Sequence, residues 1–408
     1  MNILSINKFY WRKGGSEAVF FGEKELLEKY GHTVVPFSMK HPNNLSSSFS
    51  KYFVNEVDYN AAGLINKINN GSKIIFSFEA RRKMEWLLQN YQPDVAHFHI
   101  FQHQISPSVL EPLKKRGIPI IFTLHDLKPI CPVYTHYLRG GICEKCQGRK
   151  FYHCTLNKCT MNSRFKSLIN TVEMYLHYLL GYYQNVDKYI AVSQFYKQQM
   201  VENGFASEKI VYLPNFINVE QYPLSNEDDG YVLYFGRLSE EKGIEILLNA
   251  AKHCPQVKFV IVGTGPQEEE LKKAAQFLKN VSFTGFKSGS ELIKLIAHSA
   301  FTVIPSQWYE NCPMAILESF ACGKPVLGAR IGGIPELIDE PEDGFCFEPK
   351  NRSDLIEKIN ILYSLGKKKR LEMGQHGRAK IKQNFSPILH YEKLLDIYKL
   401  FPGLIAFT

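Results

Sequence analysis

Short apolar runs alternate with longer stretches of helical spacing along most of the chain. Strands that read as continuous Val, Ile and Phe runs between helices are typical of a parallel sheet covered on both faces. In the first half these runs lie at residues 3–6, 33–38, 94–98, 119–124, 188–192 and 210–213. The pattern predicts one doubly wound α/β domain over residues 1–213.

A second series of the same kind follows. Residues 214–230 lack periodicity and contain the run Asn-Glu-Asp-Asp-Gly, which predicts a linker. Further strands are expected at residues 231–235, 258–262, 281–284, 301–304 and 325–327. The sequence thus predicts a second Rossmann-like domain over 231–386, facing the first across a cleft, and a helical segment, 387–408, that crosses back to the first domain.

Composition adds an expectation about compartment. No run of 18 apolar residues occurs, so no membrane-spanning helix is expected. The first residues read as a strand and not as a signal peptide. Nine cysteines then point to a reducing cytoplasm.

The net charge of +9 is concentrated in one segment. Residues 127–166 hold eight Lys and Arg residues against one acidic residue, Glu144. Such a patch attracts phosphate groups, whether of nucleic acid, an anionic membrane or a lipid-phosphate substrate.

Two glycine loops follow predicted strands, where open α/β sheets bind ligands. Gly14 and Gly15 precede the first helix, and Gly263 follows a strand of the second half. Glycine lets backbone N–H groups approach an anion at a helix start. The alternative interpretation of each loop is an ordinary tight turn.

A pair of cations follows another strand. Gly236 and Arg237 begin the segment Gly-Arg-Leu-Ser-Glu-Glu-Lys-Gly, which also contains Lys242. Two cations there would neutralise a diphosphate leaving group. The alternative is a solvated helix start, but the helix dipole disfavours cations at that end, and this favours a binding role.

Two glutamates lie in the segment that follows the predicted strand 301–304. Glu310 is expected in a turn and Glu318 inside the next helix. Carboxylates accept hydrogen bonds from hydroxyl groups, so these two suit a sugar and a ribose. Glu318 would otherwise be solvent-exposed, but its neighbours three and four residues away are largely apolar.

Together these motifs resemble the retaining glycosyltransferases of family 4, of the bacterial polysaccharide and glycolipid type. The resemblance rests on the glycine loop, the Arg237–Lys242 segment, the spaced glutamates and Gly-Gly-Ile-Pro-Glu at 332–336, in that order. It covers essentially the whole chain. It implies the GT-B fold, with two Rossmann-like domains.

The resemblance also implies roles for matching residues. Arg237 and Lys242 would hold the donor diphosphate, Glu310 the donor sugar and Glu318 the ribose. His125 would lie beside the transferred sugar. The expected catalytic residues are His125, Arg237, Lys242 and Glu310. The expected donor-binding residues are Gly14, Gly15, Gly236, Gly263, Glu318, Asn311, Pro313 and Met314.

Four cysteines form two short-spaced pairs, Cys143 with Cys146 and Cys154 with Cys159. This spacing predicts a structural zinc site within a Cys-rich insert at 127–166. Disulfides or free thiols are the alternatives. No cofactor is expected for the reaction, since no Asp-x-Asp follows a predicted strand and the two cations would replace a metal.

The sequence therefore predicts a metal-independent, retaining hexosyltransferase with a nucleotide-diphosphate sugar as donor. Its expected acceptor is a glycan or a lipid-linked sugar, and its expected location is the cytoplasm, peripheral on the cytoplasmic face of an anionic membrane. Nucleic acid is not an expected partner. The alternatives are a non-catalytic module that binds through a zinc knuckle and the basic patch, and a GT-B phosphorylase or epimerase.

Overall fold

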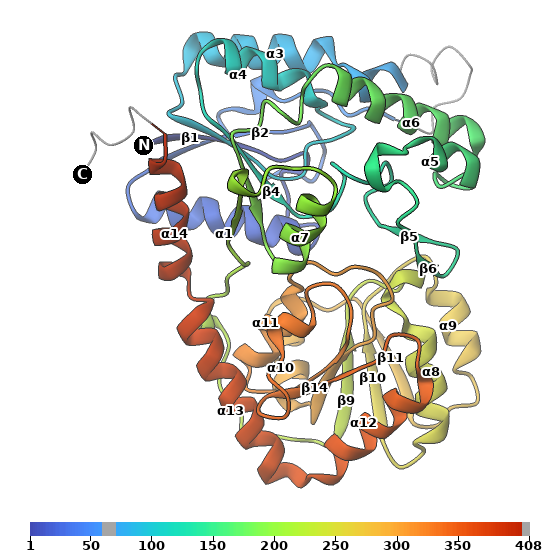
Figure 1. Ribbon diagram of the computed structural model, residues 1–408. Coiled ribbons are helices and arrows are strands. Elements are labelled where there is room, and N and C mark those ends of the chain that lie inside the picture. Colours follow the sequence, from blue (N-terminus) through green and yellow to red (C-terminus); the bar gives the residue numbers. More distant parts are fainter. Residues whose placement is uncertain (59–70, 402–408) are drawn as a thin grey trace. The chain divides into compact units, whose positions relative to one another are not determined.

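The computed structural model describes residues 1–58 and 71–401. It divides into two compact units (Figure 1). Unit 1 comprises Met1–Thr135, Glu144–Leu213 and the chain from Tyr391 onward. Unit 2 comprises His136–Cys143 and Pro214–His390. Each unit is built around one parallel sheet of six strands.

The sheet of unit 1 has the order β2-β1-β3-β4-β7-β8, and all its pairs are parallel. Its strands are β1 (Asn2–Ile6), β2 (Thr33–Phe37), β3 (Val95–Phe98), β4 (Ile120–Leu124), β7 (Lys188–Ala191) and β8 (Ile210–Tyr212). The strand order reverses between β1 and β3. In doubly wound sheets this is the point where ligands bind, outside the carboxyl ends of the strands.

The described helices of unit 1 follow the strands in sequence. They are α1 (Gly15–Lys29), α3 (Phe78–Asn90), α4 (Leu110–Lys115), α5 (Tyr152–Asn157), α6 (Arg164–Leu179) and α7 (Gln194–Glu202). Single 3-10 turns lie at Ser50–Tyr52, Pro107–Val109, Gln147–Arg149 and Ser207–Lys209.

The last helix, α14 (Pro387–Lys399), begins in unit 2 and ends in unit 1. Leu394 and Ile397 of this helix are buried in one apolar cluster with Ile3 of β1 and Val95 of β3. Removing this surface from water holds the helix end on the sheet. The described part of the predicted crossing-back segment thus packs in the core of unit 1, and its residues 402–408 lie outside the described residues.

The sheet of unit 2 has the order β11-β10-β9-β12-β13-β14 and is also wholly parallel. Its strands are β9 (Tyr231–Phe235), β10 (Lys258–Val262), β11 (Val281–Gly285), β12 (Phe301–Ile304), β13 (Val326–Ala329) and β14 (Gly344–Phe347). This is the Rossmann order 3-2-1-4-5-6, which reverses between β9 and β12.

The helices of unit 2 are α8 (Ile244–His253), α9 (Glu268–Ala274), α10 (Gly289–His298), α11 (Met314–Ala321), α12 (Arg352–Ser364) and α13 (Gly366–Asn384). Single 3-10 turns lie at Val219–Gln221, Glu240–Lys242 and Pro335–Leu337. Two doubly wound sheets, one in each unit, confirm the predicted fold class.

Two features differ from the sequence prediction. Strand β14 was not predicted, because its four residues follow an acidic, proline-containing loop and are too few to show a period. The sequence predicts that the whole Cys-rich insert belongs to the first domain, but the insert is divided between the two units. Its hairpin of β5 (Tyr137–Leu138) and β6 (Gly141–Ile142) belongs to unit 2, and the rest belongs to unit 1.

Within the described ranges, no helix has both the length and the apolar character needed to cross a bilayer.

Candidate functional site

The predicted diphosphate segment lies where the strand order of unit 2 reverses. Gly236 and Arg237 directly follow β9, and Ser306 follows β12, its neighbour in the sheet. A Cβ on Gly263, at the end of β10, would lie 1.9 Å from the carbonyl oxygen of Gly236. The two loops therefore pack backbone against backbone, which only glycine permits at Gly263.

The side chains of Lys242 and Glu310 meet at this edge. Lys242 Nζ lies 2.7 Å from Glu310 Oε1, and the Ser306 hydroxyl donates to the same oxygen at 2.6 Å. Glu310 is only 5% exposed. Burial alone would raise the pKa of this carboxyl, but Lys242 and the hydrogen bond from Ser306 hold it below its ordinary value. Glu310 is therefore an ionised acceptor at neutral pH.

The turn that carries Glu310 is fixed by two glycines. A Cβ on Gly332 would lie 2.4 Å from the backbone oxygen of Glu310, and Gly333 donates its N–H to that oxygen at 2.8 Å. Gly332 also has a φ of 60°, which favours glycine. Gly332 and Gly333 thus fix the backbone from which the Glu310 carboxylate projects.

Glu318 lies on α11, partly buried. The Tyr222 hydroxyl donates to Glu318 Oε1 at 3.2 Å. Burial raises the pKa of Glu318 to about 7, although the hydrogen bond from Tyr222 opposes this. The carboxyl is therefore partly protonated at neutral pH. The alternative that Glu318 is simply a solvent-exposed residue is wrong.

The remaining predicted residues of unit 2 flank this pair. Arg237 is exposed, and its carbonyl accepts a hydrogen bond from Tyr234 at 2.8 Å. The Asn311 side chain accepts from the N–H of Cys312 at 2.6 Å. Pro313 caps α11 and Met314 is its first residue. Asn311, Pro313 and Met314 thus shape the backbone between the two glutamates.

A hairpin that the sequence did not connect with this site lies against it. Tyr137 of β5 places its hydroxyl 3.4 Å from Glu240 Oε1 and 3.4 Å from Gln307 Oε1. Both partners belong to the loops that carry Lys242 and Glu310. Only the Cys-rich composition of the insert hinted at a distinct role there.

His125 follows β4 in unit 1, where its ring nitrogen Nε2 lies 2.9 Å from Nδ1 of His99. Burial lowers the pKa of His125 to about 4, so the ring is neutral at pH 7. The next residue, Asp126, accepts the backbone N–H of Lys128 through Oδ1 at 3.0 Å. The buried partner of His125 is thus a second histidine that the sequence prediction missed.

Gly14 and Gly15 stand at the start of α1 in unit 1. A Cβ on Gly14 would approach Glu17 Oε2 no closer than 3.6 Å, an ordinary contact, so space alone does not require glycine there. Glu17 is buried, and burial raises the pKa of its carboxyl. The predicted contact of this loop with phosphate stays a prediction.

His125 and Lys242 belong to different units, so the cleft that would join them also stays a prediction.

The four paired cysteines divide between the units, with Cys143 in unit 2 and Cys146, Cys154 and Cys159 in unit 1. A hydrogen bond from Cys159 lowers the pKa of Cys154 to about 7. Among the described residues, the only group of three or more His, Cys, Asp or Glu ligands close enough for one ion lies elsewhere. Zinc at the cysteines therefore remains a prediction.

Comparison with known proteins identifies the family. Residues 13–221 match the model of Glycosyltransferase Family 4, and residues 217–380 match that of Glycosyl transferases group 1. An uncharacterized glycosyltransferase of Methanocaldococcus jannaschii is 30% identical over 54% of this chain and 60% of its own length. An amylovoran biosynthesis glycosyltransferase of Erwinia amylovora is 25% identical over 51% of this chain and 55% of its own.

The chain thus spans less than two thirds of the length of these relatives. A solved structure of Anabaena HepE in complex with UDP shares the fold with a TM-score of 0.66, at 18% identity over 98% of this chain and 100% of that one. The family 4 model alone extends over half of the residues, and its match runs through the glycine loop, β3 and His125. The chain belongs to glycosyltransferase family 4.

Proposed function

We propose that this protein transfers a sugar from a nucleotide-diphosphate sugar to a glycan or a lipid-linked sugar. The observation that carries the proposal is the contact of Lys242 with buried Glu310 at the strand-order reversal of unit 2, where Arg237 follows β9. A cation for a diphosphate and a carboxylate for sugar hydroxyls meet there. The family match does not favour the non-catalytic alternative.

The cations would stabilise the leaving group. As the glycosidic bond breaks, negative charge grows on the nucleotide diphosphate. Arg237 is exposed and Lys242 half-buried, so phosphate oxygens can reach both. Fixed cations aimed at charge that develops in the transition state lower the barrier without reorganisation. This supports a reaction in which no metal holds the diphosphate.

The carboxylates would position the donor. Glu310 is ionised and held by Lys242 and Ser306, so its remaining lone pairs can accept hydroxyl groups of the sugar. Glu318 would accept the ribose hydroxyls in its ionised form. Positioning of this kind converts binding energy into rate.

We propose retention of the anomeric configuration. In this mechanism the acceptor attacks the face from which the diphosphate departs, and a donor phosphate oxygen takes the acceptor proton. His125, neutral at pH 7, would contact the sugar without acting as a strong base. No covalent bond to the protein is needed.

Names of similar proteins suggest where to look for substrates. The HepE structures contain UDP, UDP with glucose, and UDP-glucose, which makes UDP-sugars the first donors to test. The Erwinia relative serves amylovoran biosynthesis, which supports polysaccharide assembly as the setting.

Helix α6 supports the proposal of peripheral membrane contact, because its buried face is largely polar and its exposed face is apolar. Its buried side is largely polar and includes Ser167, Asn170, Thr171, Glu173 and His177. Its exposed side is apolar at helical spacing, with Phe165, Leu168, Val172, Tyr175 and Leu179, the last 83% exposed. We call these five residues the apolar stripe. An exposed stripe of this kind suits the boundary of a lipid layer.

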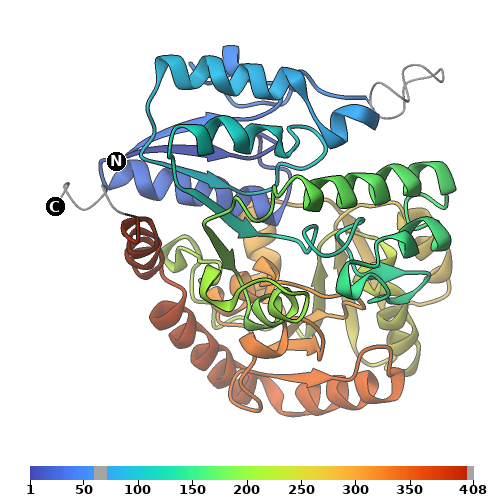
Figure 2. The ribbon, with the colours of Figure 1, turned by 45° about the horizontal axis from the view of Figure 1, so that its top comes forward.

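The inward polar face of α6 is anchored by charge. Glu173 accepts from buried Lys128 at 2.7 Å, which fixes the orientation of the helix. Basic residues are exposed on α6 and in the segment before α5: Arg164 lies on α6 itself, and Arg149 and Lys150 precede α5. α5 packs against α6 (Figure 2). Positive charge beside apolar surface favours an anionic leaflet on the cytoplasmic side.

The direct test is a thermal-shift screen of nucleotide diphosphates and nucleotide-sugars, because a ligand of the folded state raises the melting temperature. The best donor is then incubated with candidate glycans, and the anomeric configuration of the product is read by NMR. We expect a shift with one nucleotide class and a product with the anomer of the donor. No shift with any nucleotide-sugar would contradict the donor, and an inverted anomer would contradict retention.

A further inference from the structure

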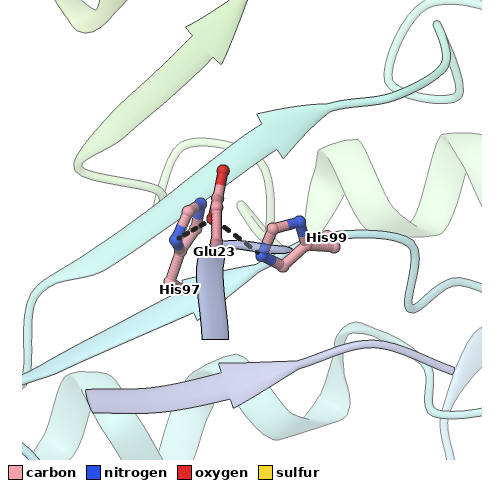
Figure 3. A group of neighbouring side chains, drawn as sticks. All are labelled: Glu23, His97 and His99. Carbon is pink, nitrogen blue, oxygen red and sulfur yellow. Dashed lines mark ion pairs between the residues drawn. The ribbon is translucent and has the colours of Figure 1, made fainter. Parts of the chain in front are cut away.

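Three potential metal ligands converge inside unit 1, beside the polar network that reaches His125. They are Glu23 on α1, His97 on β3 and His99 just after it (Figure 3). Their side chains are only 1–4% exposed. We call these residues the Glu-His-His cluster. Buried ionisable groups require pairing or a metal ion to offset the cost of their desolvation.

The local structure explains why the ligands meet. Residues i and i+2 of a strand point to the same face, so His97 and His99 present their rings side by side. Glu23 lies on the side of α1 whose other buried members include Val19, Phe20 and Leu27. A carboxylate thus takes a position at which the helix otherwise buries apolar groups.

The spacing between the carboxylate oxygen and the two ring nitrogens fits a shared metal ion. Glu23 Oε2 lies 3.5 Å from His97 Nδ1 and 3.5 Å from His99 Nε2. Direct N–H···O hydrogen bonds would be about 2.7–3.2 Å long. Around a tetrahedral zinc ion with bonds of about 2.0–2.1 Å, ligand atoms stand about 3.3 Å apart.

The outer nitrogen of each histidine has a hydrogen-bond partner. His97 Nε2 lies 2.7 Å from Thr123 Oγ1, and His99 Nδ1 lies 2.9 Å from His125 Nε2. Metal-bound histidines usually donate their second N–H to a carboxylate, a backbone carbonyl or water, which fixes the ring. A hydroxyl and an imidazole nitrogen can accept that N–H here. The Tyr398 hydroxyl, 2.8 Å from His97 Nδ1, brings a phenol oxygen to the inner side.

We propose that Glu23, His97 and His99 bind a divalent transition-metal ion, of which zinc is the best match. One carboxylate and two imidazoles are ligands that Zn²⁺ accepts readily. Because the cluster is buried, the ion is structural and does not meet substrate. It ties α1 to β3.

The ion would also set the tautomer of His125. With Nε2 of His99 on the metal, Nδ1 of His99 carries the proton and donates it to Nε2 of His125. The proton of His125 then resides on its own Nδ1. The importance of this tautomer for sugar transfer rests on the proposed role of His125. The metal site itself does not rest on that role.

The experiment measures metal and not activity. Wild-type protein and the variants Glu23→Gln and Glu17→Gln are loaded with zinc chloride, freed of excess metal by gel filtration, and analysed by elemental analysis. Glu17 is a matched control because it is another buried glutamate of the same helix. We expect Glu23→Gln to hold one zinc atom per chain fewer than Glu17→Gln and wild type. Equal zinc in all three proteins would overturn the proposal.

A second measurement uses only wild-type protein and so tests the site even if Glu23→Gln does not fold. X-ray absorption at the zinc edge of wild-type protein should show a nitrogen and oxygen shell with imidazole scattering, at about 2.0–2.1 Å. A shell of sulfur alone, or no retained zinc, would overturn the site. Neither result bears on sugar transfer, so failure here is distinguishable from failure of the proposed function.

Discussion

The ammonium group of Lys242 lies 2.7 Å from the carboxylate of Glu310, across 68 residues of sequence. Glu310 is buried, so it depends on this cation for its charge. A donor diphosphate that draws Lys242 toward its oxygens would compete with Glu310 for the same group. Donor phosphates and donor sugar would thereby be coupled through a single side chain.

Changing Lys242 or Arg237 to alanine should each reduce transfer by about 2–4 kcal/mol of transition-state stabilisation, by analogy with lost oxyanion donors. Lys242→Ala should have a further effect, because it leaves Glu310 buried beside no cation and raises its pKa. The measurement is kcat/KM for the donor as a function of pH. For Lys242→Ala we expect recovery toward higher pH, as Glu310 ionises again.

Lys272→Ala is the matched control. Lys272 pairs with Glu268 on the surface of α9, and surface pairs of this kind contribute little. Near-normal turnover in a folded Arg237→Ala protein would refute the diphosphate role of Arg237.

Donor affinity should depend on Glu318. With a pKa of about 7, its carboxylate fraction falls about tenfold between pH 8 and pH 6. If the carboxylate accepts ribose hydroxyls, the donor Kd should rise by up to about tenfold over that range. Glu318→Gln should bind more weakly at pH 8 and lose this dependence. The same pH profile in Glu318→Gln and wild type would exclude Glu318 as its source.

Stability gives an independent reading of the same group. The folded state holds the Glu318 proton more tightly than the unfolded state, whose pKa is near 4.5. Its stabilising contribution is therefore complete below pH 4.5 and is lost as pH rises through 7. Glu318→Gln should raise the melting temperature, relative to wild type, more at pH 8 than at pH 5.

The sequence singles out Lys242 and Glu310 because both residues follow strands, and strand ends are where doubly wound sheets bind ligands. It could not show that β9 and β12 are neighbours, since strand order depends on how helices cross the sheet. Ser306 and Tyr222 were missed as partners for the same reason. Their contacts are made across the fold.

The Glu-His-His cluster lay beyond sequence reasoning. The spacing of His97 and His99 was visible, but nothing in the pattern of α1 marks Glu23 as buried against them. An acidic residue on an amphipathic helix is usually exposed. Only the packing of α1 on the sheet brings its carboxylate between the two rings.

The reaction should not need an exchangeable metal. In the proposed mechanism Arg237 and Lys242 would supply two positive charges where other enzymes use a bound cation. Initial rates measured within minutes of adding EDTA should therefore equal those without it. The buried Glu-His-His cluster would retain its ion over that time and does not face the donor. Activity lost to EDTA and restored specifically by Mg²⁺ or Mn²⁺ would contradict the prediction.

Membrane contact should require both the apolar stripe and the basic residues. The double variant Leu168→Ser/Leu179→Ser replaces the two most exposed residues of the apolar stripe, which are 48% and 83% exposed. We expect wild type to bind vesicles with anionic lipid better than neutral ones and to release them as salt rises. The double variant should bind several-fold more weakly in co-sedimentation.

Phe277→Ser is the control for lost surface apolarity. Phe277 is 86% exposed but lies in unit 2, away from the basic segment in sequence. Equal binding of wild type to anionic and neutral vesicles would contradict the role of the basic residues in membrane contact. Unchanged binding of the double variant would contradict the role of α6.

Zinc bound by Cys143, Cys146, Cys154 and Cys159 is the last prediction. The lowered pKa of Cys154 favours the thiolate that zinc binds. Binding of all four thiolates would fix the loops that carry them, so zinc should order the insert. Protein purified under reducing conditions should contain zinc with a sulfur shell at about 2.3 Å, and Cys154→Ser should lose it. Donor binding in unit 2 should persist in that variant. Absence of sulfur-bound zinc, with four titratable thiols from this segment, would show that the cysteines hold no metal.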